Sequence, residues 1–340
     1  MRILLVQTSF FGDLILSTPV IKALAEIYPG AEISVMTTKA ARPLIERDPL
    51  IKRVICFDKR GQHGGLKGFR LMLTELKSFK FDCVYSLHRS YRTALLLALA
   101  RIPLRIGYAQ ARLSFLYQRL KDRPAGEHDV LRNLSLLEGE GSYDREHIRL
   151  RLTAPEASQV SERIARLGQL ARKPVVVFPG SEWQTKMWHW QGYRQVVEHF
   201  VSRGFPLFVL GGPREKTVAG LVSEGLKVEN LAGSTTLDEV LFLVKNAALV
   251  ICNDSMALHV ASALQVPVVP IFCSTSPAFG FGPWQVASRI MERSDLPCKP
   301  CRRHGSRACP LGTEECMRGL SATTVIRAAE ELLGGISKDR

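Results

Sequence analysis

The stretch RILLVQTSFFGDLILSTPVIKAL (residues 2–24) decides the fold class. It opens with an apolar run of strand type, passes through a short loop of small and aromatic residues, and ends in an apolar run with helical spacing. One carboxylate, Asp13, lies where the strand gives way to the helix, and Pro19 suits the first turn of that helix. The stretch therefore predicts a strand–helix unit with an acid beyond the carboxyl end of its strand.

The same alternation continues along the chain and restarts once. The expected strands lie at residues 2–7, 32–37, 53–58, 82–88 and 104–108, and then, after a mixed polar segment at 139–173, at 174–180, 205–212, 228–233, 248–255 and 266–272. Strands that alternate with helices indicate parallel sheets buried on both faces. We therefore predict an α/β fold of two Rossmann-like, doubly wound domains, residues 1–160 and 161–340, that face a central cleft. The C-terminal helix could pack back on the first domain.

Length and apolar runs exclude a membrane-spanning chain. At 340 residues, two domains are expected. The apolar run at 93–104 is interrupted by Arg101 and is shorter than the roughly 20 residues that a membrane span needs. The N-terminus has no charged leader and no small-residue cleavage site. We therefore expect a cytoplasmic protein.

The net charge of +14 is unevenly spread. Basic residues crowd positions 50–125, where only Asp58, Glu75, Asp82 and Asp122 oppose them. Such a block predicts an anionic partner, which could be nucleic acid, a phospholipid surface or a phosphorylated substrate, although a solvated basic face is the simpler alternative. Few aromatic residues are interleaved with the cations, and this disfavours nucleic acid.

The eight cysteines fall into two groups. Four lie singly in apolar strand-like runs, where a thiol acts as a small buried hydrophobe: Cys56, Cys83, Cys252 and Cys273. The other four crowd into CKPCRRHGSRACPLGTEEC (298–316): Cys298, Cys301, Cys309 and Cys316. They could supply four thiolates to a structural metal, but the spacing is shorter than in common zinc ribbons. Reduced packing cysteines or an adventitious disulfide are the favoured interpretations, and no metal is predicted at the site.

Two strand ends in the second half could bind an anion. In FPGSEWQTKMWHW (178–190), a Gly-Ser turn can present backbone N–H groups and Lys186 can neutralise a phosphate. In ICNDSMALHVASA (251–263), Asn253, Asp254 and Ser255 precede a helix that carries His259. Each stretch also has a purely structural explanation, as a core-capping loop, a helix cap or a core histidine.

Two acids raise the same choice between capping and function. Glu215, in LGGPREK (210–216), could accept hydrogen bonds from ribose hydroxyls or could be a first-turn acid that interacts with the helix dipole. Asp13 could be a helix cap or a general base. The loop TSFFGD lacks the G-x-G-x-x-G spacing, which disfavours a nicotinamide or flavin site.

Three of these stretches, TSFFGDLILSTPVIKAL, PGSEWQTKMW and CNDSMALHVASAL, resemble motifs of glycosyltransferase family 9, the ADP-heptose:lipopolysaccharide heptosyltransferases. The cysteine-rich tail is similar to that of many members of the heptosyltransferase II type. The resemblance implies the GT-B fold and metal-independent, inverting transfer of heptose from ADP-L-glycero-D-manno-heptose to the lipopolysaccharide inner core, as the second heptose on heptosyl-Kdo2-lipid A. A heptosyltransferase I or III type is the alternative, and a basic nucleic-acid-binding protein is the rival from another class.

The resemblance also implies roles for individual residues. Asp13 would be the general base, Ser181 and Lys186 would hold the diphosphate, and Glu215 would bind the ribose. Asp254, Ser255 and Met256 would line the donor site, with His259 further out. The expected acceptor-binding residues are Arg60, His88, Arg89 and Arg92. Glu182 replaces the hydroxyl residue common in heptosyltransferase I proteins, which favours the second type. No cofactor is required, and peripheral association with the inner face of the inner membrane is expected.

Overall fold

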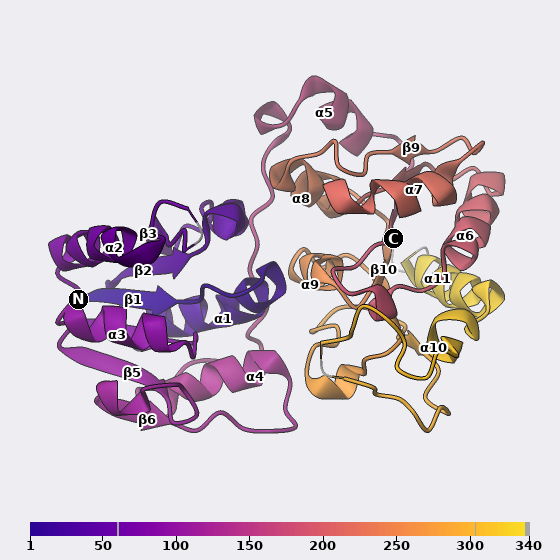
Figure 1. Cartoon of the computed structure of the whole chain (residues 1–340). Coiled ribbons are helices and arrows are strands. Elements are labelled where there is room, and N and C mark those ends of the chain that lie inside the picture. Colours follow the sequence, from indigo (N-terminus) through magenta and orange to yellow (C-terminus); the bar gives the residue numbers. More distant parts are fainter. Residues whose placement is uncertain (60, 303, 337–340) are drawn as a thin grey trace. The chain divides into compact units, whose positions relative to one another are not determined.

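The computed structural model describes residues 1–59, 61–302 and 304–336 (Figure 1). The chain divides into two compact units, Met1–Thr153 and Ala154–Arg340. Within the described residues, each unit is built on one parallel sheet of six strands. The predicted α/β class with two doubly wound sheets is confirmed.

The strands of the first unit alternate with helices, as the sequence predicts. They are β1 (Arg2–Val6), β2 (Glu32–Thr37), β3 (Ile51–Cys56), β4 (Cys83–Ser86), β5 (Leu104–Tyr108) and β6 (Arg119–Lys121), in the order β3-β2-β1-β4-β5-β6. The helices are α1 (Phe11–Ile27), α2 (Gly65–Phe79), α3 (Tyr91–Leu99) and α4 (Asp129–Leu134), with short 3₁₀ turns η1 (Lys39–Leu44), η2 (Ser114–Leu116) and η3 (Ser135–Leu137).

Both faces of this sheet are buried. Residues 3–6 of β1 are fully buried although successive side chains of a strand point to opposite faces. On one face, Met72 and Leu76 of α2 and Leu96 and Leu97 of α3 pack in one core with Leu4, Val6 and Val84 of the sheet. Helices α1 and α4 pack against each other. This arrangement leaves the carboxyl ends of the strands as the place where polar loops gather.

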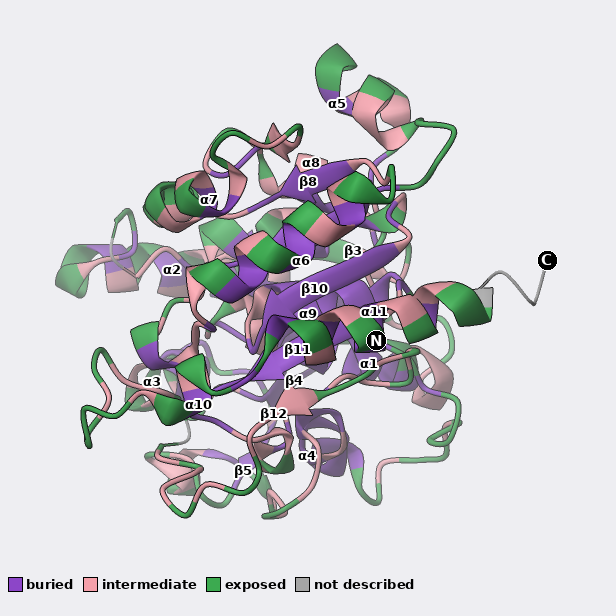
Figure 2. Ribbon diagram, turned by 90° about the vertical axis from the view of Figure 1, so that its right-hand side faces the viewer, coloured by how far each residue is buried: buried purple, intermediate pink, exposed green. Residues whose placement is uncertain are grey.

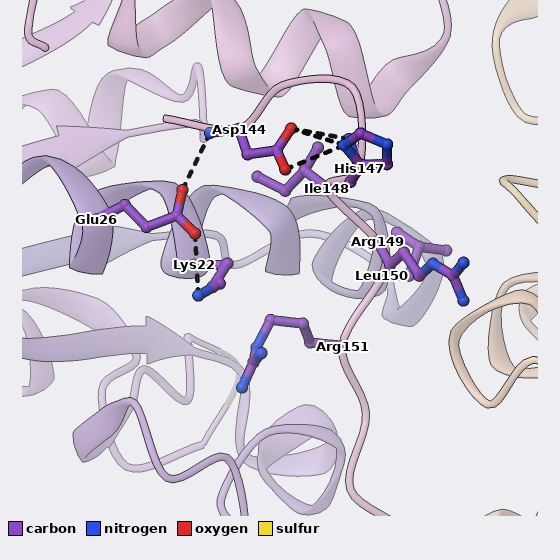
Figure 3. A pocket seen from close by; sticks show the side chains of 8 residues that line it. All are labelled: Lys22, Glu26, Asp144, His147, Ile148, Arg149, Leu150 and Arg151. Atoms are coloured by element: carbon purple, nitrogen blue, oxygen red, sulfur yellow. Dashed lines mark hydrogen bonds and ion pairs between the residues drawn. The ribbon is translucent and has the colours of Figure 1, made fainter. Parts of the chain in front are cut away.

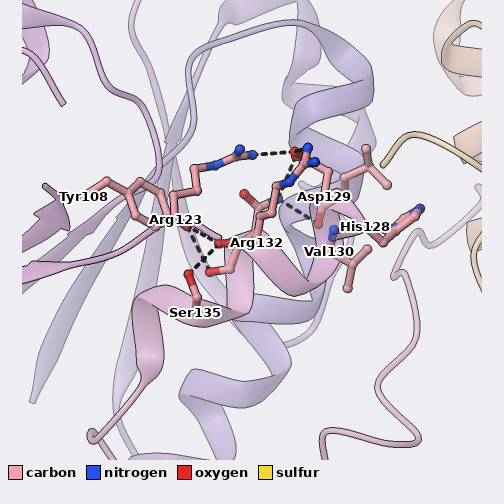
Figure 4. Close-up of polar contacts among 9 residues, drawn as sticks. Tyr108, Arg123, His128, Asp129, Val130, Arg132 and Ser135 are labelled. Carbon is pink, nitrogen blue, oxygen red and sulfur yellow. Dashed lines mark hydrogen bonds and ion pairs between the residues drawn. The ribbon is translucent and has the colours of Figure 1, made fainter. Parts of the chain in front are cut away.

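A buried ionic network anchors α4 (Figure 4). The carboxylate of Asp129 pairs with Arg123 and lies 3.5 Å from the guanidinium of Arg132. The hydroxyl of Tyr108 donates to the carbonyl of Arg132 at 2.6 Å. Asp129 and Arg132 are both buried. An unpaired charge would be costly there, and these ion pairs avoid that cost.

The second unit repeats the plan. Its strands are β7 (Val175–Phe178), β8 (Leu207–Val209), β9 (Glu229–Asn230), β10 (Leu249–Asn253), β11 (Val268–Phe272) and β12 (Met291–Glu292), in the order β12-β11-β10-β7-β8-β9. Its helices are α5 (Glu162–Gly168), α6 (Trp190–Ser202), α7 (Lys216–Ser223), α8 (Leu237–Lys245), α9 (Met256–Ala263), α10 (Glu315–Arg318) and α11 (Ala322–Ile336). The 3₁₀ turns are η4 (Ala157–Gln159), η5 (Gln184–Lys186), η6 (Pro213–Glu215) and η7 (Pro277–Phe279).

The C-terminal helix belongs to the second unit. Val325, Ala329 and Leu332 of α11 share a core with Val196 of α6 and with the buried strands of this sheet. Figure 2 shows β10 buried along its length, whereas α6 and α11 carry exposed residues. This helix therefore packs on the sheet of its own unit, and its packing on the first domain stays a prediction.

No described helix is both long and apolar enough to cross a membrane. The division between the units falls at Thr153–Ala154, a few residues before the expected boundary at 160. The assignment of acceptor binding to the first domain and donor binding to the second stays a prediction.

Candidate functional site

The predicted donor residues of the second unit gather at one edge of its sheet. Strands β7 and β10 are neighbours, with β8 and β11 on their outer sides, so the strand order reverses between them. Ligands of open parallel sheets bind beyond the carboxyl ends of the strands at such a switch point. Ser181 follows β7, Glu215 follows β8 and Asp254 follows β10, so the structure brings these three predicted positions to this edge.

Lys186 and Asp254 form the charged centre of this group. The Lys186 ammonium lies 2.7 Å from Oδ2 of Asp254, and both side chains are largely buried. The hydroxyl of Thr275 donates to the same carboxylate oxygen at 2.7 Å. Asp254 is therefore held by a cation and a hydroxyl, and its carboxylate in turn fixes where the ammonium stands.

Asn253 ties down the loop that carries Lys186. Its side-chain amide donates to the carbonyls of Pro179 and Gly180 at 2.9 and 3.1 Å. Its side-chain oxygen accepts a hydrogen bond from the N–H of Trp188 at 2.9 Å. The loop is thus fastened near both ends by one buried residue, which the sequence indicated only as part of a polar turn.

Glu215 is pressed against the end of β7. Its carboxylate accepts a hydrogen bond from the N–H of Gly212 at 2.6 Å, and burial raises its pKa. A Cβ at Gly180 would lie 2.3 Å from Oε1 of Glu215, so only glycine permits this approach. The first-turn contact with Gly212 is observed, and ribose binding stays a prediction.

Ser255 and Met256 open α9, directly after Asp254. Ser255 is the N-cap residue, but its hydroxyl makes no capping hydrogen bond to the helix. Met256 is the first helical residue and is partly exposed, whereas His259 is buried one turn further on. The exposed Glu182 pairs with Arg214 at 3.2 Å, on the surface of the same loop region.

The first unit has its own switch point, between β1 and β4. Asp13 lies there in the first turn of α1, and its carboxylate accepts a hydrogen bond from the N–H of Phe10 at 3.3 Å. The capping interaction is therefore present. It does not exclude a base, because each carboxylate oxygen carries two lone pairs and the capping hydrogen bond uses one of them.

A group that the sequence did not single out lies near the same edge. Lys59, three residues after β3, donates to the hydroxyl of Thr8 at 2.7 Å. Burial, and then the charge of Arg92, lowers the pKa of Lys59 to about 8. The position of Lys59 just beyond a predicted strand could have marked it as a candidate site residue. The many other basic residues at positions 50–125 made it impossible to single out.

The predicted acceptor-binding residues differ in their contacts and in their exposure to solvent. His88 contacts the hydroxyl of Thr93 through Nδ1 at 2.8 Å, and burial, with Lys59 and Arg89, lowers its pKa to about 4, so it is neutral at pH 7. Arg92 donates to the carbonyl of His63 at 2.6 Å. Arg89 is exposed, and Arg60 lies outside the described residues.

Among the buried polar atoms that have no hydrogen-bond partner within the described residues, two lie at the ends of β1 and β2. They are Oε1 of Gln7, just beyond β1, and Oγ1 of Thr37, the last residue of β2. Buried polar groups are nearly always paired, so unpaired ones at the carboxyl edge of a parallel sheet are suited to a polar ligand.

The four tail cysteines are free thiols. Across residues 1–59, 61–302 and 304–336, no three His, Cys, Asp or Glu side chains lie together in a way that could hold a metal ion. The alternative of a tetrathiolate metal site therefore gains no support from the geometry. Cys83, Cys252 and Cys273 are buried, as expected, whereas Cys56 is only partly buried.

A separate pocket of about 250 Å³ lies away from these groups (Figure 3). Lys22 and Glu26, in the last turns of α1, line it together with residues 144 and 147–151. Lys22 pairs with Glu26 at 2.9 Å, and the N–H of Asp144 donates to Glu26 at 3.2 Å. Asp13 lies at the other end of α1, on the order of 15 Å away at 1.5 Å per residue, so this pocket is distinct from the candidate site.

Comparison with solved structures identifies the fold as GT-B, the fold of two Rossmann-like domains found in many glycosyltransferases. A glycosyltransferase of family 9 from Veillonella parvula matches with a TM-score of 0.85 at 24% identity, covering 98% of this chain and 97% of that one. The Escherichia coli ADP-heptose lipopolysaccharide heptosyltransferase II matches with a TM-score of 0.80 at 23% identity, covering 99% and 100%. The E. coli heptosyltransferase WaaC with ADP matches at 0.76 and 20%, covering 98% and 100%.

Sequence comparisons identify the family of this chain. The family model for glycosyltransferase family 9 (heptosyltransferase) matches residues 70–311, so the chain belongs to this family and is a glycosyltransferase. Lipopolysaccharide heptosyltransferase 2 of E. coli K12 is 29% identical over 301 residues, with 82% of this chain and 84% of that protein covered. Lipopolysaccharide heptosyltransferase 3 of the same strain is 27% identical, covering 81% and 83%. The resemblance read from the three motifs is confirmed.

Proposed function

We propose that this glycosyltransferase transfers heptose from ADP-L-glycero-D-manno-heptose to the inner core of lipopolysaccharide, and that it adds the second heptose to heptosyl-Kdo2-lipid A. Family membership and the relatives named heptosyltransferase 2 support the proposal. The observation that carries it is the Lys186–Asp254 pair at the switch point of the second sheet. A type III acceptor is the alternative, since the heptosyltransferase 3 relative is almost as similar.

The donor half of the proposal follows from the strand ends of the second unit. Lys186 and Ser181 hold the diphosphate, and Glu215 binds the ribose. Asp254, Ser255 and Met256 line the donor, and His259 supports them from inside α9. As the bond to the sugar breaks, negative charge builds on the leaving ADP, and a fixed ammonium stabilises that charge. No metal and no cofactor are required in this scheme.

The acceptor half needs a base. Inverting transfer requires a group that removes the proton of the attacking hydroxyl on the side of the anomeric carbon opposite the leaving ADP. Asp13 is the proposed base, and the hydrogen bond from the Phe10 N–H fixes its orientation. General-base assistance contributes typically about 10²–10⁴-fold. Lys59, Arg60, Arg89 and Arg92 supply positive charge for an acceptor that bears carboxylates and phosphates, and the neutral His88 supplies a polar contact.

The outer surface of the first unit supports peripheral binding to the inner leaflet of the inner membrane, from the cytoplasmic side. Large apolar side chains are exposed on α2, α3 and η2: Leu66, Leu71, Tyr91, Leu95, Leu99 and Phe115. Exposed cations accompany them on α2 and beside η2: Lys67, Arg70, Lys77 and Arg112. Glu75 is the one acid in the described sequence of these three elements. Exposed apolar side chains accompanied by cations suit an anionic bilayer, at about 1 kcal/mol per near-surface cation.

Two substrates test the proposal. The purified protein is incubated with ADP-heptose and either Kdo2-lipid A or heptosyl-Kdo2-lipid A. The masses of the products are then determined by mass spectrometry. Addition of one heptose to heptosyl-Kdo2-lipid A alone is the expected result. Transfer to Kdo2-lipid A instead would assign a type I activity, and transfer to neither with turnover on a longer core would assign type III. Stabilisation by ADP-heptose in a thermal melt, but not by UDP-sugars, is expected to accompany the first result.

A further inference from the structure

The tail segment that holds the four cysteines contacts the proposed donor loop directly. We define the donor loop as residues 183–188. Thr185 of this loop is buried, and its N–H donates to the carbonyl of Ser306 at 3.1 Å. The N–H of Ser306 returns a hydrogen bond to Oγ1 of Thr185 at 2.8 Å. The two residues are thus joined in both directions although 121 positions separate them.

A second contact reaches Lys186 itself. Gly305 adopts a positive φ of +77°, and a Cβ built on it would lie 3.0 Å from Cγ of Lys186 and 3.0 Å from Cβ of Trp183. The backbone of Gly305 therefore lies against the aliphatic stem of Lys186. The lysine side chain is long and flexible, so backbone packed against its methylene groups restricts the positions that the ammonium can occupy.

A third contact completes the enclosure of Thr185. The N–H of Cys301 donates to the carbonyl of Ser274 at 3.0 Å, and the hydroxyl of Ser274 donates to Oγ1 of Thr185 at 3.0 Å. The N–H of Ser274 also donates to the carbonyl of Thr185 at 3.2 Å. We call Cys301, Gly305 and Ser306 the brace.

The donor loop itself contains little regular structure. It has one 3₁₀ turn, η5, and no strand or α-helix. Asn253 holds the chain at Pro179, ahead of the donor loop, and at Trp188, the last residue of the loop, and the brace holds the middle, where Lys186 lies. We infer that the brace is part of the donor site and that Gly305 and Ser306 are positioning residues, which set the place of the Lys186 ammonium for the diphosphate.

This inference rests on the proposed role of Lys186. The alternative hypothesis is that the cysteine-rich tail is a separate structural module. In that case, substitutions in the tail would change stability but would leave the affinity for the nucleotide unchanged.

A pair of glycines gives a matched test. Gly305 and Gly312 both have positive φ, +77° and +69°, so alanine imposes similar backbone strain at each. At Gly312, however, an added Cβ meets nothing within 4 Å. Gly305→Ala is expected to weaken ADP binding roughly tenfold and to raise KM for ADP-heptose, because small misplacements of a contacting group are costly. Gly312→Ala is expected to keep the wild-type affinity for ADP.

A second pair keeps the test decisive if Gly305→Ala does not fold. Thr185→Val removes the oxygen that accepts from Ser306 and Ser274, whereas Thr185→Ser keeps it. Weakened ADP binding in the valine variant, restored in the serine variant, is expected. KM for the acceptor should not change in either, which separates lost positioning from general loosening of the fold.

One further variant separates this inference from the proposed function. Calorimetric titration with ADP is run on wild type, Lys186→Met and the four variants above. If Lys186→Met binds ADP as wild type does, the proposed role of Lys186 fails. If it binds weakly while Gly305→Ala matches Gly312→Ala, and Thr185→Val matches Thr185→Ser, the role of Lys186 stands and the positioning role of the brace is overturned.

Discussion

The side-chain oxygen of Asn253 and the backbone N–H of Trp188 are joined by a hydrogen bond of 2.9 Å, although 65 residues separate them in the chain. Since the amide of Asn253 also donates to the carbonyls of Pro179 and Gly180, one buried side chain closes the loop that presents Ser181 and Lys186. The last residue of β10 thereby sets the shape of the loop that follows β7.

This closure predicts the effect of Asn253→Asp. A carboxylate has the same shape but cannot donate to the two carbonyls, which are then left unpaired at about 1–3 kcal/mol each. We expect a lower midpoint of thermal unfolding and a KM for ADP-heptose at least several-fold higher, with KM for the acceptor little changed. Steady-state kinetics and a thermal melt measure both. Unchanged donor KM in a folded variant would show that the loop needs no such closure.

The two interpretations of Asp13 are separated by Asp13→Asn. Asparagine keeps an oxygen that can accept from the Phe10 N–H, so stability should fall by no more than about 1 kcal/mol. If Asp13 is the base, kcat should fall by about 10²–10⁴-fold while ADP binding stays intact. Activity within a few-fold of wild type would leave Asp13 as a helix cap only.

The lowered pKa of Lys59 predicts that kcat/KM for the acceptor depends on pH near pH 8. Its pKa is lowered to about 8 by burial and by Arg92, so the cation that attracts an anionic acceptor is lost as pH rises through that value. kcat/KM for the acceptor should fall above about pH 8, and Lys59→Arg, which stays charged, should move that fall to higher pH. ADP binding serves as the control and should show no matching limb in either protein.

The same shift has a consequence for folding with a definite sign. The unfolded chain holds the proton of Lys59 up to a pKa near 10.5, whereas the folded protein releases it near 8. Between these values the unfolded state binds more protons, so the contribution of Lys59 to stability increases as pH rises. Denaturant unfolding of wild type and Lys59→Met at pH 7 and pH 9.5 measures it, and the gain on raising pH should be smaller in the variant.

Cys309 is expected to react more readily than Cys301 and Cys316, two other thiols of the tail. Backbone N–H groups, that of Glu314 first, lower its pKa, whereas burial raises the pKa of Cys316 to about 11. The thiolate is the nucleophile that displaces iodide from iodoacetamide, so brief treatment at pH 7 should modify Cys309 before Cys301 or Cys316. Peptide mass spectrometry reads the order, and Cys252 and Cys273 should react only after denaturation because both are buried. Preferential modification of Cys316 would contradict the assignment.

The proposed membrane surface can be tested on one helix. Tyr91, Leu95 and Leu99 are exposed and spaced by four residues, so they form a stripe along α3. Leu95→Ser with Leu99→Ser should reduce sedimentation with vesicles of phosphatidylglycerol and phosphatidylethanolamine several-fold. Leu221→Ser, at an exposed leucine of the second unit, is the matched control and should bind as wild type does. Equal binding of all three proteins would remove α3 from the surface.

Ten of the described strands, the edge strands β3 and β9 among them, lie within or overlap ranges predicted from the sequence, and the edge strands β6 and β12 do not. Strands such as β1 and β10 are continuous apolar runs that follow from burial on both faces, and their positions match the expected ranges closely. The sequence did not predict the edge strands β6 (RLK) and β12 (ME), because they are short and largely polar. Pairing with a neighbour, rather than their own composition, makes them strands.

The site divides in the same way. Residues at the end of a predicted strand, such as Ser181 and Asp254, could be singled out because strand ends are visible in the pattern. Asn253 as a loop clasp, Thr275 as a partner of Asp254 and Ser306 as a partner of Thr185 were not found. Their roles depend on contacts between distant segments, and no local spacing encodes such contacts.

The contact between Gly180 and Glu215 limits how this enzyme could diversify. Any side chain at position 180 would meet the carboxylate of Glu215, so a larger residue there requires that carboxylate to move or position 215 to shorten. The reverse change is open, since shortening position 215 first leaves Gly180 unhindered. The two positions are therefore coupled, and a lineage that shortened position 215 would gain room to vary at position 180 as well.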